Sequence, residues 1–158
     1  MKQTIKTEKA VSAYRVLSTA KYGQLADADK IKVWKIARVL KPIATSFEDT
    51  AKDAAEKFKP TTEGFDEQYE KFLSFQRMVN LPNVDAKKLP MGVAEYNQFL
   101  TDVVLPYNKL VEDAIKEFGG KDVEIEFAGL SEDAFGKLMA SNEWTVEQAI
   151  EIGNLIVE

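Results

Sequence analysis

The chain has 158 residues, 45% of them apolar and 30% charged, which is the composition of an ordinary globular protein of one domain. It contains neither histidine nor cysteine, so disulfides, thiolate metal sites and catalytic pairs of serine or cysteine with histidine are excluded. No apolar run approaches the ~20 residues of a membrane-spanning helix, and no signal peptide is recognisable. We therefore expect a cytoplasmic protein that does not enter a membrane.

Charge is distributed unevenly along the chain. The net charge is −5, but residues 1–41 carry ten Lys and Arg against three acidic residues, whereas residues 42–158 carry eleven against twenty-three. Such polarity is evidence about association rather than about fold. It predicts a basic surface in the first quarter of an otherwise acidic protein.

The first predicted helix runs over 7–22. Apolar side chains recur in it at helical spacing, Thr7 is a suitable N-cap, and Gly23 is a natural stop. A long second helix is predicted over 29–58, where apolar residues follow one another at steps of three or four and so form one stripe. The stripe consists of Val33, Ile36, Leu40, Ile43, Phe47, Ala51, Ala54 and Phe58. Because Pro42 removes one backbone hydrogen bond, we expect either a bend there or two helices end to end.

A turn over 59–64 precedes a third predicted helix over 65–79, and residues 80–91 form the longest predicted loop. The fourth helix, over 93–118, contains Pro106 and carries a second apolar stripe. This stripe consists of Val93, Tyr96, Leu100, Val104, Tyr107, Val111, Ala114 and Phe118.

Residues 123–127 alternate between apolar and acidic side chains, the pattern of a half-buried strand. A single strand is not stable alone, and three partners are open: residues 83–89, the region around Gln24, or a second copy of the chain. Two short helices follow, the first capped by Ser131 and the second beginning with a capping box at Thr145.

These elements predict a mainly α fold with minor β structure. The two long stripes favour an antiparallel helical bundle, completed by one short strand and a small C-terminal helical cap. All residues are assigned to a single helical domain, with the bundle over 1–118 and the strand and two short helices packed on it over 119–158.

The polar side of the second helix is the first candidate site. Basic residues around an aromatic can bind nucleic-acid phosphates and stack a base. The face consists of Lys30, Trp34, Lys35, Arg38 and Lys41. The favoured alternative is a solvated face on which the first helix covers Trp34, or a face that docks against the protein's own acidic part. The acidic balance of the whole chain also argues against a dedicated nucleic-acid binder.

Carboxylates form the second candidate, because several on one helical face can hold Mg²⁺ or Ca²⁺. They are Asp66, Glu67 and Glu70, then Glu143, Glu147 and Glu151 at a spacing of four, and Glu124 and Glu126 on the strand. A solvated acidic face is the favoured interpretation, and no metal or other cofactor is predicted.

The third candidate is the loop over 80–91, whose apolar residues we expect to cap the protein's own core. These are Leu81, Val84, Leu89 and Met91.

Several segments together form a recognisable layout. They are the opening Val11-Ser12-Ala13-Tyr14-Arg15-Val16-Leu17, the Lys-rich helix 30–38 that leads into Phe47-Glu48-Asp49, the helix with Glu95-Tyr96-Asn97, the strand 123–126 and the helical C-terminal tail. The layout resembles a family of short, mostly helical proteins of unknown function that are encoded by phages and prophages. The resemblance implies origin and architecture only, and Pro42, Pro106 and the loop over 80–91 depart from it.

We predict a non-enzymatic protein-interaction module of phage or prophage origin, acting in assembly or in modulating a host partner. Its partner is another protein or a second copy of itself, and its contact surfaces are the basic face around Trp34 and the acidic C-terminal half. The alternative is a nucleic-acid-associated protein that uses the basic face of residues 30–41. The third hypothesis is an enzyme with a carboxylate-bound metal.

Overall fold

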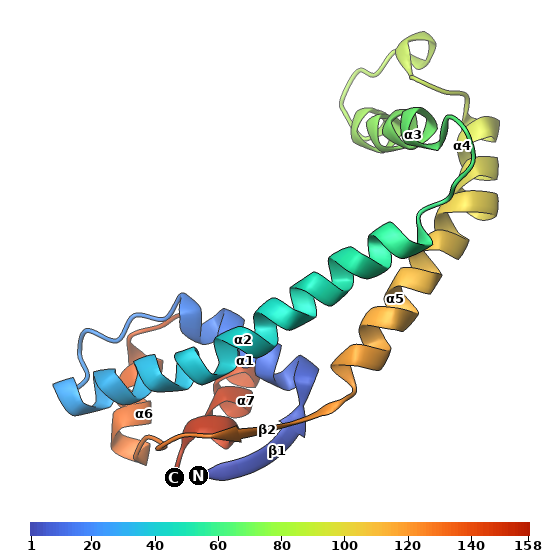
Figure 1. The fold of residues 1–158 in the computed structure, drawn as a ribbon. Helices are drawn as coiled ribbons and strands as arrows, with labels where there is room; N and C mark the ends of the chain where they lie inside the picture. Colours follow the sequence, from blue (N-terminus) through green and yellow to red (C-terminus); the bar gives the residue numbers. More distant parts are fainter. The chain divides into compact units, whose positions relative to one another are not determined.

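The computed structural model describes residues 1–158 and is mainly α-helical with one small two-stranded sheet (Figure 1). The predicted class, mainly α with minor β, is confirmed. The chain divides into two compact units, which we call unit 1 (Met1–Ala51 and Ile115–Glu158) and unit 2 (Lys52–Ala114). The assignment of all residues to a single domain stays a prediction. None of the helices combines the length and the apolar character needed to cross a membrane.

The elements follow one another in the order that Figure 1 labels. They are β1 (Lys2–Lys6), α1 (Thr7–Ser18), α2 (Asp27–Phe58), α3 (Phe65–Val79), the 3₁₀ turn η1 (Ala86–Lys88), α4 (Val93–Phe99), the π-helical segment η2 (Leu100–Val104), α5 (Leu105–Gly119), β2 (Asp122–Glu126), α6 (Glu132–Ala140) and α7 (Val146–Ile156).

The core of unit 1 forms between α1, α2, the sheet, α6 and α7. The predicted stripe supplies its centre on α2, where Val33, Ile36 and Leu40 are buried. Each such side chain contributes roughly 1.5–3 kcal/mol through the apolar surface it removes from water. From the C-terminal part, Leu130, Leu138 and Ile156 are fully buried against the same cluster. Residues more than a hundred positions apart therefore complete one core.

The sheet joins the two ends of the chain. β1 pairs antiparallel with β2, in a register that runs from Lys2 opposite Glu126 to Lys6 opposite Asp122. All three partners predicted for the strand over 123–127 are therefore wrong. The strand segment 2–6 was not predicted because Ile5 is its one apolar side chain and alternation is then too weak to detect. Ion pairs join the strands, with Nζ–carboxylate distances of 2.9 Å for Lys2–Glu124 and 2.7 Å for Lys6–Asp122.

The start of α1 differs from the prediction. Thr7 is the first helical residue rather than the N-cap, and its side chain is buried. Its backbone N–H and its hydroxyl both donate to the carbonyl oxygen of Lys121, each over 2.9 Å. Thr7 thus ties the beginning of α1 to the residue before β2. The helix also ends earlier than predicted, at Ser18.

Neither internal proline divides its helix. α2 is one helix through Pro42, so the alternative of two helices end to end is wrong. Before Pro106 the helix widens into the π-helical segment Leu100–Val104 and then continues as α5. A π-helical turn contains one extra residue, which shifts the pattern of backbone hydrogen bonds. This shift accommodates the absence of a backbone N–H at Pro106.

Unit 2 has a core of its own, built from aromatic side chains of α3, α4 and the helix that follows. Its buried residues are Phe65, Phe72, Phe75, Met91, Phe99 and Val104. The prediction that Val93 begins the stripe of the fourth helix is wrong, because its side chain is 61% exposed and Phe99 is buried instead. The π-helical segment shifts the helical phase, so one uniform stripe cannot describe the whole helix.

Tyr107 on α5 gives the stability of unit 2 a dependence on alkaline pH. Its hydroxyl donates over 2.8 Å to the carbonyl oxygen of Ala55. Burial, reinforced by Tyr69 and opposed by Lys59, raises the pKa of Tyr107 above its ordinary value of 10.0. Because the folded pKa is the higher one, this contribution is complete below the unfolded pKa and is lost as pH rises through the folded pKa.

We therefore expect Tyr107→Phe to lower stability by roughly 1 kcal/mol at neutral pH, through the lost hydrogen bond. The same variant should lose less stability than the wild type at high pH. The measurement is the urea midpoint of both proteins across the alkaline range, and parallel curves would contradict the assignment.

Candidate functional site

The basic face predicted on the second helix lies in unit 1, on the first turns of α2. The Trp34 side chain is 55% exposed, so the prediction that the first helix covers it is wrong. Lys35, Arg38 and Lys41 are exposed beside it. The side chain of Trp34 therefore presents a large apolar surface to solvent among basic groups.

The cations of this face divide into paired and unpaired groups. Lys30 forms an ion pair of 3.0 Å with Asp27 one turn earlier, so part of its charge is already compensated. Lys35, Arg38 and Lys41 pair with no acidic residue of unit 1. Docking of this face against the acidic part of its own unit is therefore wrong. The Arg38 guanidinium instead lies over the Trp34 ring, 5.3 Å from its centroid, in a cation–π contact.

Sequence reasoning missed one member of this surface. Ile31 is 53% exposed and lies one turn before Trp34 and Lys35. Helical periodicity could have identified Ile31, because it places this apolar residue on the polar side of the predicted helix. We call the surface made of Ile31, Trp34, Lys35, Arg38 and Lys41 the Trp34 stripe.

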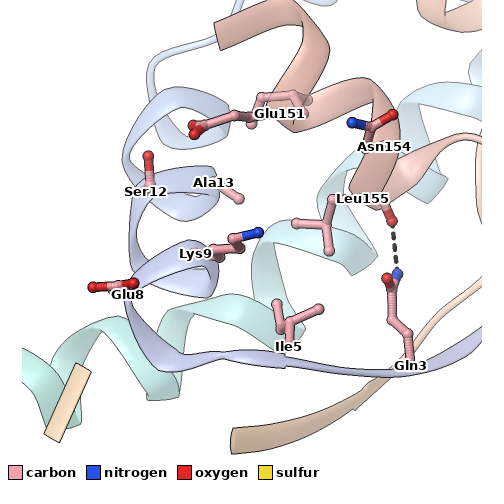
Figure 2. A pocket seen from close by; sticks show the side chains of 10 residues that line it. Gln3, Ile5, Glu8, Lys9, Ser12, Ala13, Glu151, Asn154 and Leu155 are labelled. Atoms are coloured by element: carbon pink, nitrogen blue, oxygen red, sulfur yellow. Dashed lines mark hydrogen bonds between the residues drawn. The ribbon is translucent and has the colours of Figure 1, made fainter. Parts of the chain in front are cut away.

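A groove of about 370 Å³ lies elsewhere in unit 1, between β1, α1 and α7 (Figure 2). Its apolar lining comes from Ile5, Ala13, Ile152 and Leu155. Figure 2 shows the Gln3 side chain reaching toward α7, where its Nε2 donates over 2.7 Å to the carbonyl oxygen of Leu155. The groove could not be predicted from the sequence because β1 was not.

The rim of the groove is polar and of mixed charge. It is lined by Glu8, Lys9, Ser12, Glu151 and Asn154. The volume lies near the lower end of the ~300–1,000 Å³ range of small-molecule sites. With one cation and two carboxylates on its rim, the groove does not favour a ligand of one particular charge. The Trp34 stripe, whose charges are all positive, therefore gives a clearer indication of its partner.

The carboxylates considered as metal ligands do not converge on a common point as the ligands of a metal site do. No group of three acidic side chains has an arrangement that could hold a metal ion. Asp66 pairs with Lys59 over 2.7 Å, and Glu67 with Lys71 over 2.9 Å. The hydrogen bond with Lys71 lowers the pKa of Glu67, and the same bond raises the pKa of Lys71. Glu124 is held by Lys2 on the neighbouring strand.

The loop over 80–91 behaves in part as predicted. Met91 is buried in the core of unit 2, Leu89 packs against that core, and Val84 is half-buried. Leu81 is exposed, so the expectation that it caps the core is wrong. The loop therefore closes unit 2 mainly with residues from its C-terminal end.

Comparison with known proteins adds no relative: no protein-family model, curated protein or solved structure matches the chain. The surfaces of the molecule therefore carry the evidence about function, and the Trp34 stripe is the most distinctive of them.

Proposed function

We propose that the protein is a non-enzymatic protein-interaction module that binds its partner through the Trp34 stripe. The observation that carries this proposal is the exposed Trp34 ring, beneath an Arg38 guanidinium that has no carboxylate partner. Tryptophan and arginine are the residues most enriched among those that dominate binding energy at protein interfaces. Ile31 extends the apolar part of the surface by one helical turn.

The charge of the stripe specifies the partner's chemistry. Lys35, Arg38 and Lys41 would each be desolvated on binding, and an acidic partner would compensate them. Complementary charge would also speed association and fix the orientation of the partner. The resemblance to helical phage proteins fits a role in assembly or in modulating a host protein, and we include that role in the proposal.

The proposal predicts that Trp34→Ala weakens partner binding by at least about 30-fold, the effect of removing an interface hot spot. Thermal stability should change little, because truncation of an exposed side chain usually costs within about 0.5 kcal/mol. The measurement is capture of host proteins on the immobilised protein, followed by an affinity measurement with each protein identified. Leu110→Ala removes another exposed apolar side chain and serves as the matched control.

The result that overturns the proposal is retention of the same proteins, at the same affinity, by the wild type and by Trp34→Ala. Fluorescence adds a direct readout, since Trp34 and Trp144 are the two tryptophans of the chain. In a Trp144→Phe background, emission from Trp34 should shift to shorter wavelength when a partner covers the ring.

A nucleic-acid-associated function is the second candidate, favoured by three unpaired cations beside an exposed aromatic ring. The acidic balance of residues 42–158 opposes it, because those carboxylates repel phosphates. Binding of single-stranded DNA and RNA at low salt decides between the two. A stripe that binds phosphates should lose affinity as salt rises, with a slope of about −0.7 per phosphate contact for single strands.

A further inference from the structure

A second exposed surface of unit 1 has the opposite charge to the Trp34 stripe. On α7, the side chains of Val146 and Ile150 are 78% and 57% exposed, although both are apolar. Glu147 and Glu151 are exposed beside them. At about 100° per residue these four side chains fall within one sector of about 140° on the helix. We call them the α7 face.

The carboxylates of the α7 face have no internal partner. Neither Glu147 nor Glu151 takes part in an ion pair, whereas Asp133 on the preceding helix is bound by Lys137 over 2.7 Å. The capping box that begins α7 uses the Thr145 hydroxyl and the Gln148 amide, so these carboxylates are not needed to cap the helix. Both the charged and the apolar parts of the α7 face are therefore available to a partner.

The two surfaces are complementary in charge, and the α7 face covers about half the length of the Trp34 stripe. The Trp34 stripe offers two apolar side chains and three unpaired cations over 31–41, about 15 Å of helix at 1.5 Å per residue. The α7 face offers two apolar side chains and two unpaired carboxylates over 146–151, about 8 Å of helix. Both belong to unit 1, and within one copy each remains open to solvent.

We propose that these two surfaces bind each other between two copies of the chain. The Trp34 stripe of one copy packs on the α7 face of the second, placing Trp34 and Ile31 against Val146 and Ile150. Lys35, Arg38 and Lys41 then meet Glu147 and Glu151. A two-fold axis makes the same contact twice, so both copies bury both surfaces. This inference rests on the proposed function, because it names the partner of the Trp34 stripe.

Charge selects this pairing over the other symmetric ones. Stripe against stripe would bring six cations together, and α7 face against α7 face would bring four carboxylates together, so both would be repulsive. An unrelated acidic protein remains a competitor for the same stripe. The tests below distinguish it from a second copy.

The first measurement is the solution mass as a function of protein concentration and salt. We expect a monomer–dimer equilibrium that shifts toward monomer as salt rises, because screening weakens exposed ion pairs. Trp34→Ala and Ile150→Ala should each weaken dimerisation by at least about 30-fold without altering any charge. Leu110→Ala in unit 2 should leave the dimer unchanged.

The decisive measurement is a charge swap. One variant, Lys35→Glu/Arg38→Glu/Lys41→Glu, reverses the stripe, and a second, Glu147→Lys/Glu151→Lys, reverses the α7 face. Each should be monomeric alone, with circular dichroism verifying that it is folded. Mixed together they should form a heterodimer, because each stripe then meets an α7 face of opposite charge. As a control, exchanging the charges of the exposed pair Lys109–Asp113 should change nothing.

Three results would overturn the inference: a monomer at every concentration, a dimer that survives both reversals, or a mixture that stays monomeric. The proposed function is tested separately. If the wild type were monomeric and retained a host protein that Trp34→Ala does not retain, the proposed function would stand. The partner of the Trp34 stripe would then be that host protein and not a second copy of the chain.

Discussion

Replacing Phe72 with alanine is expected to destabilise unit 2 by about 3–5 kcal/mol, the cost of removing a large buried aromatic side chain. Phe72 lies on α3 and is only 2% exposed. Its ring stacks on Tyr96 at a centroid distance of 4.7 Å and on Tyr69 at 6.1 Å, and it meets the edge of Phe99 at 5.7 Å. Truncation therefore removes three aromatic contacts as well as buried apolar area.

The cavity left by this truncation is difficult to close. Tyr96 also stacks on Phe75, with ring centroids 4.3 Å apart, so it cannot move into the space without losing that contact. The measurement is amide hydrogen exchange of α3, because both tryptophans lie in unit 1 and fluorescence would not report on unit 2 directly. Val79→Ala, at an exposed position of the same helix, is the control and should cost within about 0.5 kcal/mol. Equal exchange rates in the two variants would contradict the assignment of Phe72 to the core.

Local sequence signals predicted most of the helices. The third helix has the predicted bounds, Phe65–Val79. The caps are confirmed as well, since Ser131 accepts from the Ala134 N–H and the capping box of α7 is formed by Thr145 and Gln148. Each of these features depends on residues within one or two helical turns. A sequence window can therefore contain the whole cause.

Features that depend on distant residues were not predicted. β1 is short and mostly polar, and it is stabilised by a strand about 120 residues later in the chain. The role of Thr7 depends on the carbonyl oxygen of Lys121, which no local pattern indicates. In each case the missing information is a contact rather than a propensity.

The candidate site shows the same division. Helical periodicity placed the basic residues around Trp34 on one side of α2, and the structure has them there. Whether another element covers Trp34 is a tertiary question, and the prediction that α1 does so is wrong. The α7 face was missed as an interaction surface because Val146 and Ile150 read as ordinary apolar residues of an amphipathic helix. Only their exposure in the folded chain separates them from Ile152 and Ile156, which are buried.

Two glycines should respond to alanine in opposite directions. Gly129 is buried between the chain ends, and a Cβ atom there would lie 2.9 Å from the carbonyl oxygen of Ile156 and 2.7 Å from the sulfur of Met1. The Met1 side chain could move, but the Ile156 oxygen is held by the N–H of Leu130 over 2.7 Å. We expect Gly129→Ala to cost about 1–3 kcal/mol, as overpacking of a close-packed site does.

Gly136 lies inside α6, and a Cβ atom there would meet nothing within 4 Å. Alanine at this helical position should therefore stabilise the protein by about 0.5–1 kcal/mol, by restricting the unfolded chain. Urea unfolding followed by tryptophan fluorescence measures both variants, since Trp144 packs against Phe135 beside Gly136. Because the substitution is the same in both, the opposite signs isolate the local environment as the cause. If Gly129→Ala were as stable as the wild type, the close approach of residues 129–130 to the end of α7 would be wrong. The contact that holds the C-terminal end of α7, the helix that carries the proposed pairing face, would then lose its support.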